Sequence, residues 1–256
     1  MSRLKKSPSS ELTTCVMGSP AWIKAVYEAD PARSVLGRSR PTQRNVCVDR
    51  ELGTTLAVEG RLENMALHLL EWLKYQGFVK RFKTQPFTLS KEEQGVQATP
   101  DFMFEGITHS QHVLEVKPLG SLVPSEQAQQ DEVARIVKLA RMEFVLWTDQ
   151  WPLTRTVYHN MWHMRRAAKL GFSEPDLLEV ANAVAFDSKS LEELQACAIA
   201  FDAVYAAAYR GLVFLNVFYP FQANTHVHSN APQYIHRQLF EGWCRADMAW
   251  DSLPYR

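Results

Sequence analysis

Two short apolar runs place the strongest constraint on the fold of this chain. Residues 102–104 and 113–114 are apolar, and a polar connection over residues 106–111 joins them. Runs of this length around a short polar connection predict two neighbouring strands in a hairpin or a meander. The second run continues into Glu115 and Lys117, so charged side chains interrupt a strand that otherwise has the composition of a buried one.

Helical patterns flank these strands. Apolar side chains recur at helical spacing over residues 58–76, before Gly77, and again over residues 125–142. A further apolar run at residues 143–147 predicts another strand. Helix, strand, strand, helix and strand in this order predict an α/β domain in which helices flank a mixed sheet.

The charged residues of the second strand point to a chemical role. Because successive side chains of a strand point to opposite faces, Glu115 and Lys117 share one face, and Asp101 stands at the start of the preceding strand. Two carboxylates that face one pocket bind a hard divalent cation, and a nearby lysine orients or deprotonates a water that attacks a phosphodiester. The pattern predicts a metal-dependent nuclease. The alternative is a solvated strand face on which Lys117 forms an ordinary ion pair.

A third acid lies on the first predicted helix. Glu63 shares a largely apolar flank with Leu67 and Leu70, so it is either a metal ligand or one partner of a core ion pair. Glu59 is a rival for this role. It falls at the predicted helix start, however, where acids are common because they interact favourably with the helix dipole.

Four motifs occur in order and with ordinary spacing: Val58-Glu59-Gly60-Arg61-Leu62-Glu63, Gln85-Pro86-Phe87 (expected as a strand), Thr99-Pro100-Asp101-Phe102 and Glu115-Val116-Lys117-Pro118. Over about residues 30–150 the chain resembles the TnsA endonuclease family. These proteins are the nuclease subunits of heteromeric cut-and-paste DNA transposons, and their catalytic domain resembles the type II restriction endonuclease fold. The resemblance implies that Glu63, Asp101 and Glu115 match the family's acidic positions and Lys117 its lysine. An amide sometimes stands in the family at the position of Glu115.

The resemblance implies cleavage at the 5′ ends of a transposon. A TnsB-type transposase cuts and joins the 3′ ends, and a TnsC-type AAA+ ATPase contacts the C-terminal part. We expect Asp101, Glu115 and Glu63 to hold one or two Mg²⁺, which Mn²⁺ can replace, and Lys117 to stabilise the nucleophile or the developing charge. Two alternatives stay open: a stand-alone restriction- or repair-type nuclease of the same fold, and a non-catalytic DNA-binding assembly subunit. The intact acidic set argues against the second.

Basic residues concentrate near the N-terminus. Residues 1–50 hold nine Lys and Arg against four Asp and Glu, although the whole chain has a formal net charge of zero. We expect an arm whose Arg38, Arg40 and Arg44 contact the phosphates of double-stranded DNA at the transposon ends. A solvated leader is the alternative. The expected domains are this arm at residues 1–50, the endonuclease domain at 51–150 and a C-terminal domain at 151–256.

The C-terminal domain has a different pattern. Helices are predicted at residues 155–170, 175–186 and 190–210, followed by a strand-like apolar run at 212–218. Helices followed by a short strand pair resemble a small winged-helix module. We expect this domain to dock the ATPase and the transposase, with Trp162, Arg165 and Tyr209 as candidate anchors. A helical cap on the nuclease domain is the alternative.

Other possible site signals are weak. His159 and His163 have the spacing of two zinc ligands on a helix, but the glutamate of a zinc-protease motif is missing, so no zinc site is expected. The four cysteines are scattered, which favours reduced thiols. No segment approaches a membrane-spanning length and no apolar signal segment follows the early lysines, so we expect no membrane partner and a bacterial cytoplasmic protein, at the nucleoid when active.

Overall fold

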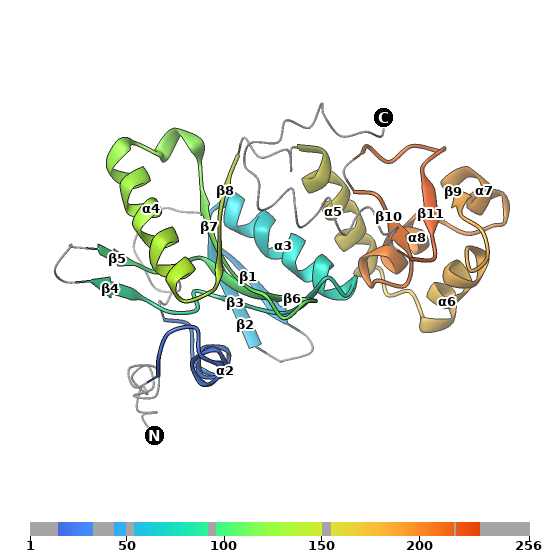
Figure 1. Ribbon diagram of the computed structural model, residues 1–256. Helices are drawn as coiled ribbons and strands as arrows, with labels where there is room; N and C mark the ends of the chain where they lie inside the picture. Colours follow the sequence, from blue (N-terminus) through green and yellow to red (C-terminus); the bar gives the residue numbers. More distant parts are fainter. Residues whose placement is uncertain are drawn as a thin grey trace, which may run out of the picture. The chain divides into compact units, whose positions relative to one another are not determined.

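The computed structural model describes residues 15–32, 44–49, 54–91, 96–149, 155–217 and 219–230. Within them it holds seven α-helices and a mixed four-stranded sheet (Figure 1), so the predicted α/β class is confirmed. The chain divides into two compact units. The first comprises Met1–Leu67 and Lys80–Thr148, and the second comprises His68–Val79 and Asp149–Arg256.

The main sheet of the first unit has the order β3-β6-β7-β8. Its strands are β3 (Val79–Thr84), β6 (Phe102–Gly106), β7 (Gln111–Lys117) and β8 (Glu143–Thr148). β6 and β7 are antiparallel, as the hairpin pattern predicted, and β7 and β8 are parallel. Two antiparallel pairs accompany this sheet: β1 (Arg44–Asp49) with β2 (Thr54–Glu59), and β4 (Leu89–Lys91) with β5 (Val96–Ala98).

Two helices cover one face of the central strands. The side chains of Met103 on β6 and Val113 on β7 point into one core cluster, to which α2 (Pro20–Glu28) contributes Trp22 and Val26. α4 (Pro124–Leu139), which follows a 3-10 turn at Leu119–Ser121 and packs against β8, contributes Val133 and Val137. The expected basic arm therefore does not extend over all of residues 1–50, because α2 is part of the core of the first unit. That segment is an amphipathic helix whose apolar side chains are buried in the core.

Local backbone geometry corrects two boundaries of the sequence analysis. The helix predicted over residues 58–76 is α3 (Arg61–Tyr75), because residues up to Glu59 belong to β2 and Gly60 turns the chain with φ +88°. Glycine adopts this left-handed conformation without the steric penalty of a Cβ. The strand expected at residues 85–87 is absent, since β3 ends at Thr84 and Gln85 has φ +46°. Pro86 then follows, and it has no N–H to extend a ladder.

The second unit contains four helices of its own and a small antiparallel sheet. The helices are α5 (Arg155–Ala168), α6 (Glu174–Ala183), α7 (Leu191–Ala196) and α8 (Phe201–Tyr209). The sheet has the order β10-β11-β9, from β9 (Lys189–Ser190), β10 (Phe214–Leu215) and β11 (His226–His228). The single helix predicted over residues 190–210 is two helices, because Ala198 between them has φ +65°. The strand expected over 212–218 is confined to β10.

The C-terminal half of α3 belongs to the core of this second unit. Trp72 lies 6.1 Å from Phe214 between ring centroids, and Gln76 donates through Nε2 to the carbonyl of Ala208 at 2.8 Å. The Tyr209 hydroxyl donates to Glu71 at 2.9 Å, and Tyr209 is buried. Tyr209 is thus a core residue, which corrects its prediction as a partner anchor. Trp162 is 47% exposed and keeps that candidacy. Within the described residues, no helix is both long and apolar enough to span a membrane.

Candidate active site

Asp101 and Glu115 face each other across the β6–β7 pair. Phe102 pairs with Leu114 in the antiparallel register, and the register continued by one residue sets Asp101 opposite Glu115. The backbone N–H of Val116 donates to Asp101 Oδ2 at 2.9 Å, which fixes the aspartate against the second strand. Asp101 is 6% exposed and Glu115 is 7% exposed. Two acids are therefore buried side by side on adjacent strands.

Lys117 forms an ion pair with one of these two acids, Glu115. Its Nζ lies 3.1 Å from Glu115 Oε1, so the predicted common face of Glu115 and Lys117 is consistent with the structure. Alternation along β7 puts Val113 on that face too, and Val113 belongs to the core cluster that α4 covers. One face of β7 therefore carries first a core residue, Val113, and then the charged pair Glu115 and Lys117.

The electrostatics of the cluster are unbalanced. Burial, and then the neighbouring charge of Asp101, raise the pKa of Glu115 to about 8, although Lys117 opposes them. Burial lowers the pKa of Lys117, but Glu115 and the other acids outweigh it and leave that pKa raised. Lys117 is therefore a cation at neutral pH, but its charge does not offset the effect of burial and of Asp101 on the pKa of Glu115.

Glu126 on α4 is a member of the cluster that the sequence analysis missed. Its Oε1 lies 3.4 Å from Lys117 Nζ, and Gln130 Nε2 donates to the same oxygen at 3.2 Å. Gln130 is 3% exposed, and its Oε1 has no hydrogen-bond partner among the residues that the structure describes. A signal for Glu126 was present in the sequence. It stands four residues before Gln130 and so continues the inward stripe of Gln130, Val133 and Val137.

The remaining predicted site residues have different surroundings. Glu63 lies in the first turn of α3, where its Oε2 accepts the backbone N–H of Glu59 at 2.9 Å. No group of three or more His, Cys, Asp or Glu side chains arranged to hold a metal ion occurs in the described segments, so a role for Glu63 beside Asp101 and Glu115 stays a prediction. Gln85 touches the site through its backbone, whose N–H donates to the carbonyl of Asp101 at 2.8 Å.

The predicted DNA-binding arginines cannot be placed as side chains. Arg38 and Arg40 lie outside the described residues. Arg44 begins β1, where its Cα pairs with that of Glu59, and its side chain is outside the described part of the chain. Phosphate contacts by these three residues therefore stay a prediction.

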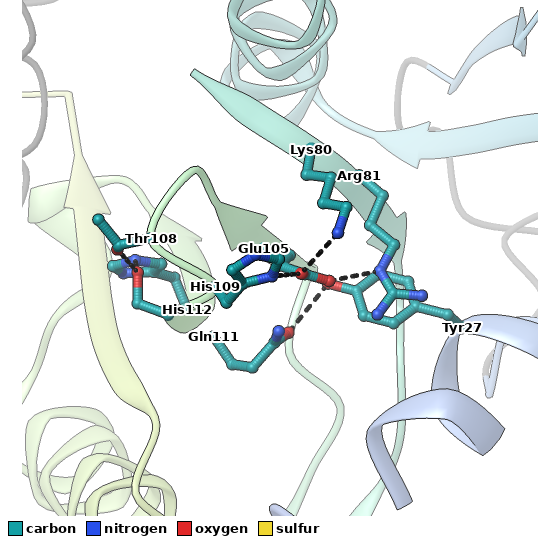
Figure 2. A network of polar contacts seen from close by, with 9 residues as sticks. Tyr27, Lys80, Arg81, Glu105, Thr108, His109, Gln111 and His112 are labelled. Atoms are coloured by element: carbon teal, nitrogen blue, oxygen red, sulfur yellow. Dashed lines mark hydrogen bonds and ion pairs between the residues drawn. The ribbon is translucent and has the colours of Figure 1, made fainter. Parts of the chain in front are cut away.

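A second buried acid lies at the hairpin end of the same two strands. Glu105, which pairs with Gln111, is 3% exposed and is surrounded by donors (Figure 2). Arg81 Nε lies 2.6 Å, His109 Nδ1 2.8 Å and Lys80 Nζ 3.6 Å from its carboxylate oxygens. Burial raises the pKa of Glu105, but the bonds from His109 and Arg81 and the charges of Arg81 and Lys80 outweigh it and leave that pKa lowered. This acid is fully compensated.

Comparison with known proteins adds no family to this description. The chain matches no model of a protein family, and no curated protein resembles it at a significant level. The candidate site therefore rests on its own residues.

Proposed function

We propose that this protein is a Mg²⁺-dependent DNA endonuclease of the TnsA type, with Asp101, Glu115 and Lys117 at its active site. The observation that carries the proposal is the pair of buried carboxylates, Asp101 and Glu115, set opposite each other on β6 and β7 with Lys117 Nζ 3.1 Å from one of them. Burying Glu115 beside Asp101 costs free energy that Lys117 does not offset, since the pKa of Glu115 stays raised. Such an arrangement is typical of a functional site.

The donor set fits a hard divalent cation. Mg²⁺ prefers oxygen ligands and is commonly bound by one or two carboxylates, completed by water and by substrate phosphates. Asp101 and Glu115 would hold the ion, with Glu63 as the predicted additional ligand. Burial and then the charge of Asp101 raise the pKa of Glu115 to about 8, and a bound cation would favour its charged form. A bound cation of this kind polarises a phosphoryl oxygen and makes water a stronger nucleophile near neutral pH.

The protein's own groups supply position and charge. Lys117 is cationic and half-buried, so its three N–H donors can orient a water or stabilise the negative charge that develops on the scissile phosphate. Glu126 and Glu115 together fix its Nζ, at 3.4 and 3.1 Å. The Val116 N–H holds one oxygen of Asp101. The side chains are thus preorganised by the strands and by α4.

The folds of both units support this proposal. The mixed sheet with the acids at the ends of its central strands agrees with a restriction-endonuclease-like domain. In the second unit, helix α6 is followed by β9, α7, α8, β10 and β11, with β11 in the middle of the sheet. This order of elements favours a winged-helix-like module. The exposed Trp162, with Arg166 5.8 Å above its ring, favours docking of a TnsC-type ATPase or a TnsB-type transposase there.

Nicking of DNA that carries the transposon ends tests the proposal. The wild-type protein, together with a TnsB-type transposase and a TnsC-type ATPase, is expected to cut the 5′ ends in Mg²⁺ or Mn²⁺ and not in EDTA. Asp101→Ala and Glu115→Ala are expected to bind the same DNA without cutting it. Wild-type cutting rates in either variant would contradict the assignment. Cutting without the partner proteins would favour the stand-alone nuclease instead, and binding with no cutting in any metal would favour the assembly subunit.

The basic segment is tested separately through salt dependence. If Arg38, Arg40 and Arg44 contact phosphates, replacing all three with Gln should weaken binding to different DNA sequences alike. The slope of log affinity against log salt concentration should fall by roughly three, about one for each lost contact. An unchanged slope, measured by fluorescence anisotropy over a salt series, would leave the segment as a solvated leader.

A further inference from the structure

A cavity in the second unit opens between α5, α8 and the connection from β10 to β11. Its volume is about 510 Å³, and Thr156, His159, Asn160, His163, Tyr205, Pro220 and Phe221 line it. One wall is aromatic, because the rings of Tyr205 and Phe221 stack at 5.3 Å. The amide of Asn160 is occupied, since it donates to the carbonyls of Val217 and Tyr219. The remaining polar side chains of the lining are the hydroxyl-bearing Thr156 and Tyr205 and the two histidines, and of these the histidines are the metal-binding type.

The two imidazoles converge on one point. His159 and His163 stand one turn apart on α5, and their Nε2 atoms are 2.9 Å apart. The rings meet edge to face, with centroids at 4.4 Å. His159 is exposed and His163 half-buried, so the pair lies at the cavity surface rather than in the core. In this geometry the two Nε2 atoms share one proton as a hydrogen bond. A metal ion can take the place of that proton, because each neutral imidazole has one nitrogen with a free lone pair.

The spacing of the two nitrogens suits a chelate. At metal–nitrogen distances of about 2.0–2.1 Å, two ligands at right angles lie about 2.9 Å apart, and two ligands at the tetrahedral angle about 3.3 Å apart. The observed distance of 2.9 Å agrees with the right-angled arrangement, and a small side-chain rotation would reach the tetrahedral one. Burial, then the charges of His159 and Arg166, lower the pKa of His163, which agrees with the neutral form that binds metals.

We propose that His159 and His163 form a binding site for a divalent transition-metal ion in the second unit, separate from the carboxylate site of the first. Imidazole nitrogen suits Zn²⁺, Cu²⁺ and Ni²⁺ rather than Mg²⁺, and right-angled nitrogen ligands are typical of Ni²⁺ and Cu²⁺. The protein supplies two ligands, and the other coordination positions open toward the cavity, where water or an entering ligand completes them. The site is independent of the proposed nuclease function.

A second pair of histidines in the same unit provides a matched contrast. His226 and His228 stand two residues apart on β11, and their ring centroids are 6.4 Å apart. This pair has the same residue types and the same number of ligands, and a ring separation 2.0 Å larger than the 4.4 Å of the α5 pair. Binding that depends on the α5 pair and not on the β11 pair would identify the site by its geometry rather than by histidine content.

Titration of Ni²⁺ into the full-length protein tests the site. The protein should be prepared without a polyhistidine tag and in 10 mM Mg²⁺, which occupies carboxylate sites. Calorimetry is run on the wild type, His159→Gln, His163→Gln and the double variant His226→Gln/His228→Gln. Far-UV circular dichroism and thermal unfolding in EDTA verify that each variant is folded. His159 is exposed, so its replacement leaves the core intact.

The wild type and the β11 double variant are expected to bind one equivalent of Ni²⁺ with similar affinity. Each single α5 variant is expected to bind at least about tenfold more weakly, since removal even of a residue behind a ligand has an effect of that size. A thermal shift that grows with Ni²⁺ concentration in the wild type, and not in His159→Gln, gives a second readout. Equal affinity in all four proteins, or loss only in the β11 variant, would overturn the assignment.

Discussion

Two buried glutamates on the same pair of strands behave in opposite ways. Glu105 on β6 and Glu115 on β7 occupy one face of the hairpin, with Met103 and Val113 between them, and each is less than a tenth exposed. The pKa of Glu105 lies below its ordinary value, and that of Glu115 is raised to about 8. Burial acts in the same direction on both. Glu115 is enclosed more deeply, and only at Glu105 do the neighbouring donors and cations outweigh burial.

The difference separates a structural acid from a candidate catalytic one. Glu105 has three basic partners, and no neighbouring acid contributes to its pKa shift. Glu115 has one basic partner, Lys117, which it shares with Glu126, and it faces Asp101. A compensated acid stabilises the fold, whereas an undercompensated one costs stability that a bound cation can restore. The comparison teaches that burial alone does not identify a site, while the charge balance around the buried group does.

The largest expected effect is on cleavage. Glu115→Ala should reduce the rate of Mg²⁺-dependent nicking by at least about 10²- to 10³-fold, as the loss of one group that stabilises the transition state does; alanine is used because an amide occurs at this position in the family. Glu105→Gln, at the opposite end of the strands, should keep a rate within a few-fold of wild type when assayed below its unfolding temperature. Single-turnover cleavage of the same DNA measures both. If both variants lost activity equally, the distinction between the two acids would fail.

The second effect is a gain in stability. Because the folded-state pKa of Glu115 is raised, its contribution to stability is present below its ordinary pKa near 4.5 and is lost as pH rises through about 8. Gln mimics the protonated acid, so Glu115→Gln should be more stable than wild type at pH 8 by roughly 4 kcal/mol and nearly equal to it at pH 4.5. Urea unfolding in EDTA at the two pH values measures this. A destabilised variant at pH 8 would mean that Lys117 compensates the carboxylate fully.

Bound Mg²⁺ should stabilise the charged form of the Glu115 carboxylate. A cation that binds Asp101 and Glu115 displaces the proton, so millimolar Mg²⁺ should raise the unfolding temperature of the wild type more at pH 8 than at pH 6. Glu115→Gln should lose most of that shift, and Glu105→Gln should keep it. Equal shifts in all three proteins would place the bound ion elsewhere.

The third effect has the opposite sign to the second. Glu105→Gln should lose about 2 kcal/mol of stability at pH 7, because hydrogen bonds to a charged group contribute about 1.5–3 kcal/mol and Gln keeps only part of them. The loss should shrink as pH falls through the lowered pKa of Glu105, since a depressed folded-state pKa gives stability that acid removes. Glu132→Gln is the control. Glu132 accepts two bonds from Arg135, both at 2.7 Å, but Arg135 is exposed to solvent, so the loss of this pair should have a smaller effect than Glu105→Gln.

Much of the sheet could be predicted from the chain because its signals are local. The apolar runs at 102–104 and 113–114 gave the hairpin β6–β7, and alternation set Glu115 and Lys117 on one face. Boundaries failed where a single backbone angle decides them. Gly60 at φ +88° ends β2 and Gln85 at φ +46° ends β3, and hydrophobic periodicity carries no information on either angle.

The site was predictable only in part, because some of the charges around each acid come from segments that are distant in the sequence. The sequence placed Asp101, Glu115 and Lys117 together, since all three belong to one hairpin. It missed Glu126, which reaches Lys117 only because α4 packs on the face of β7 that bears Val113. It also did not reveal that Glu105 is a second buried acid with basic partners. The partners Arg81 and Lys80 come from β3, and that strand's place beside β6 is a matter of topology.

The smallest expected effect ranks the partners of Glu105. Arg81 Nε lies 2.6 Å from the carboxylate, and its guanidinium stands 3.9 Å from the centre of the Tyr27 ring (Figure 2), whereas Lys80 Nζ is at 3.6 Å and its side chain is 58% exposed. Arg81→Gln should therefore cost about 1 kcal/mol, from a short charged bond and a cation–π contact, both weakened by partial exposure. Lys80→Gln should cost less than about 0.5 kcal/mol. Arg81→Lys should fall between the two, because an ammonium keeps the charge and lacks the planar fork. Urea unfolding of the three variants at pH 7 gives the ranking, and equal losses for Arg81→Gln and Lys80→Gln would show that net charge, rather than bonding geometry, compensates this acid.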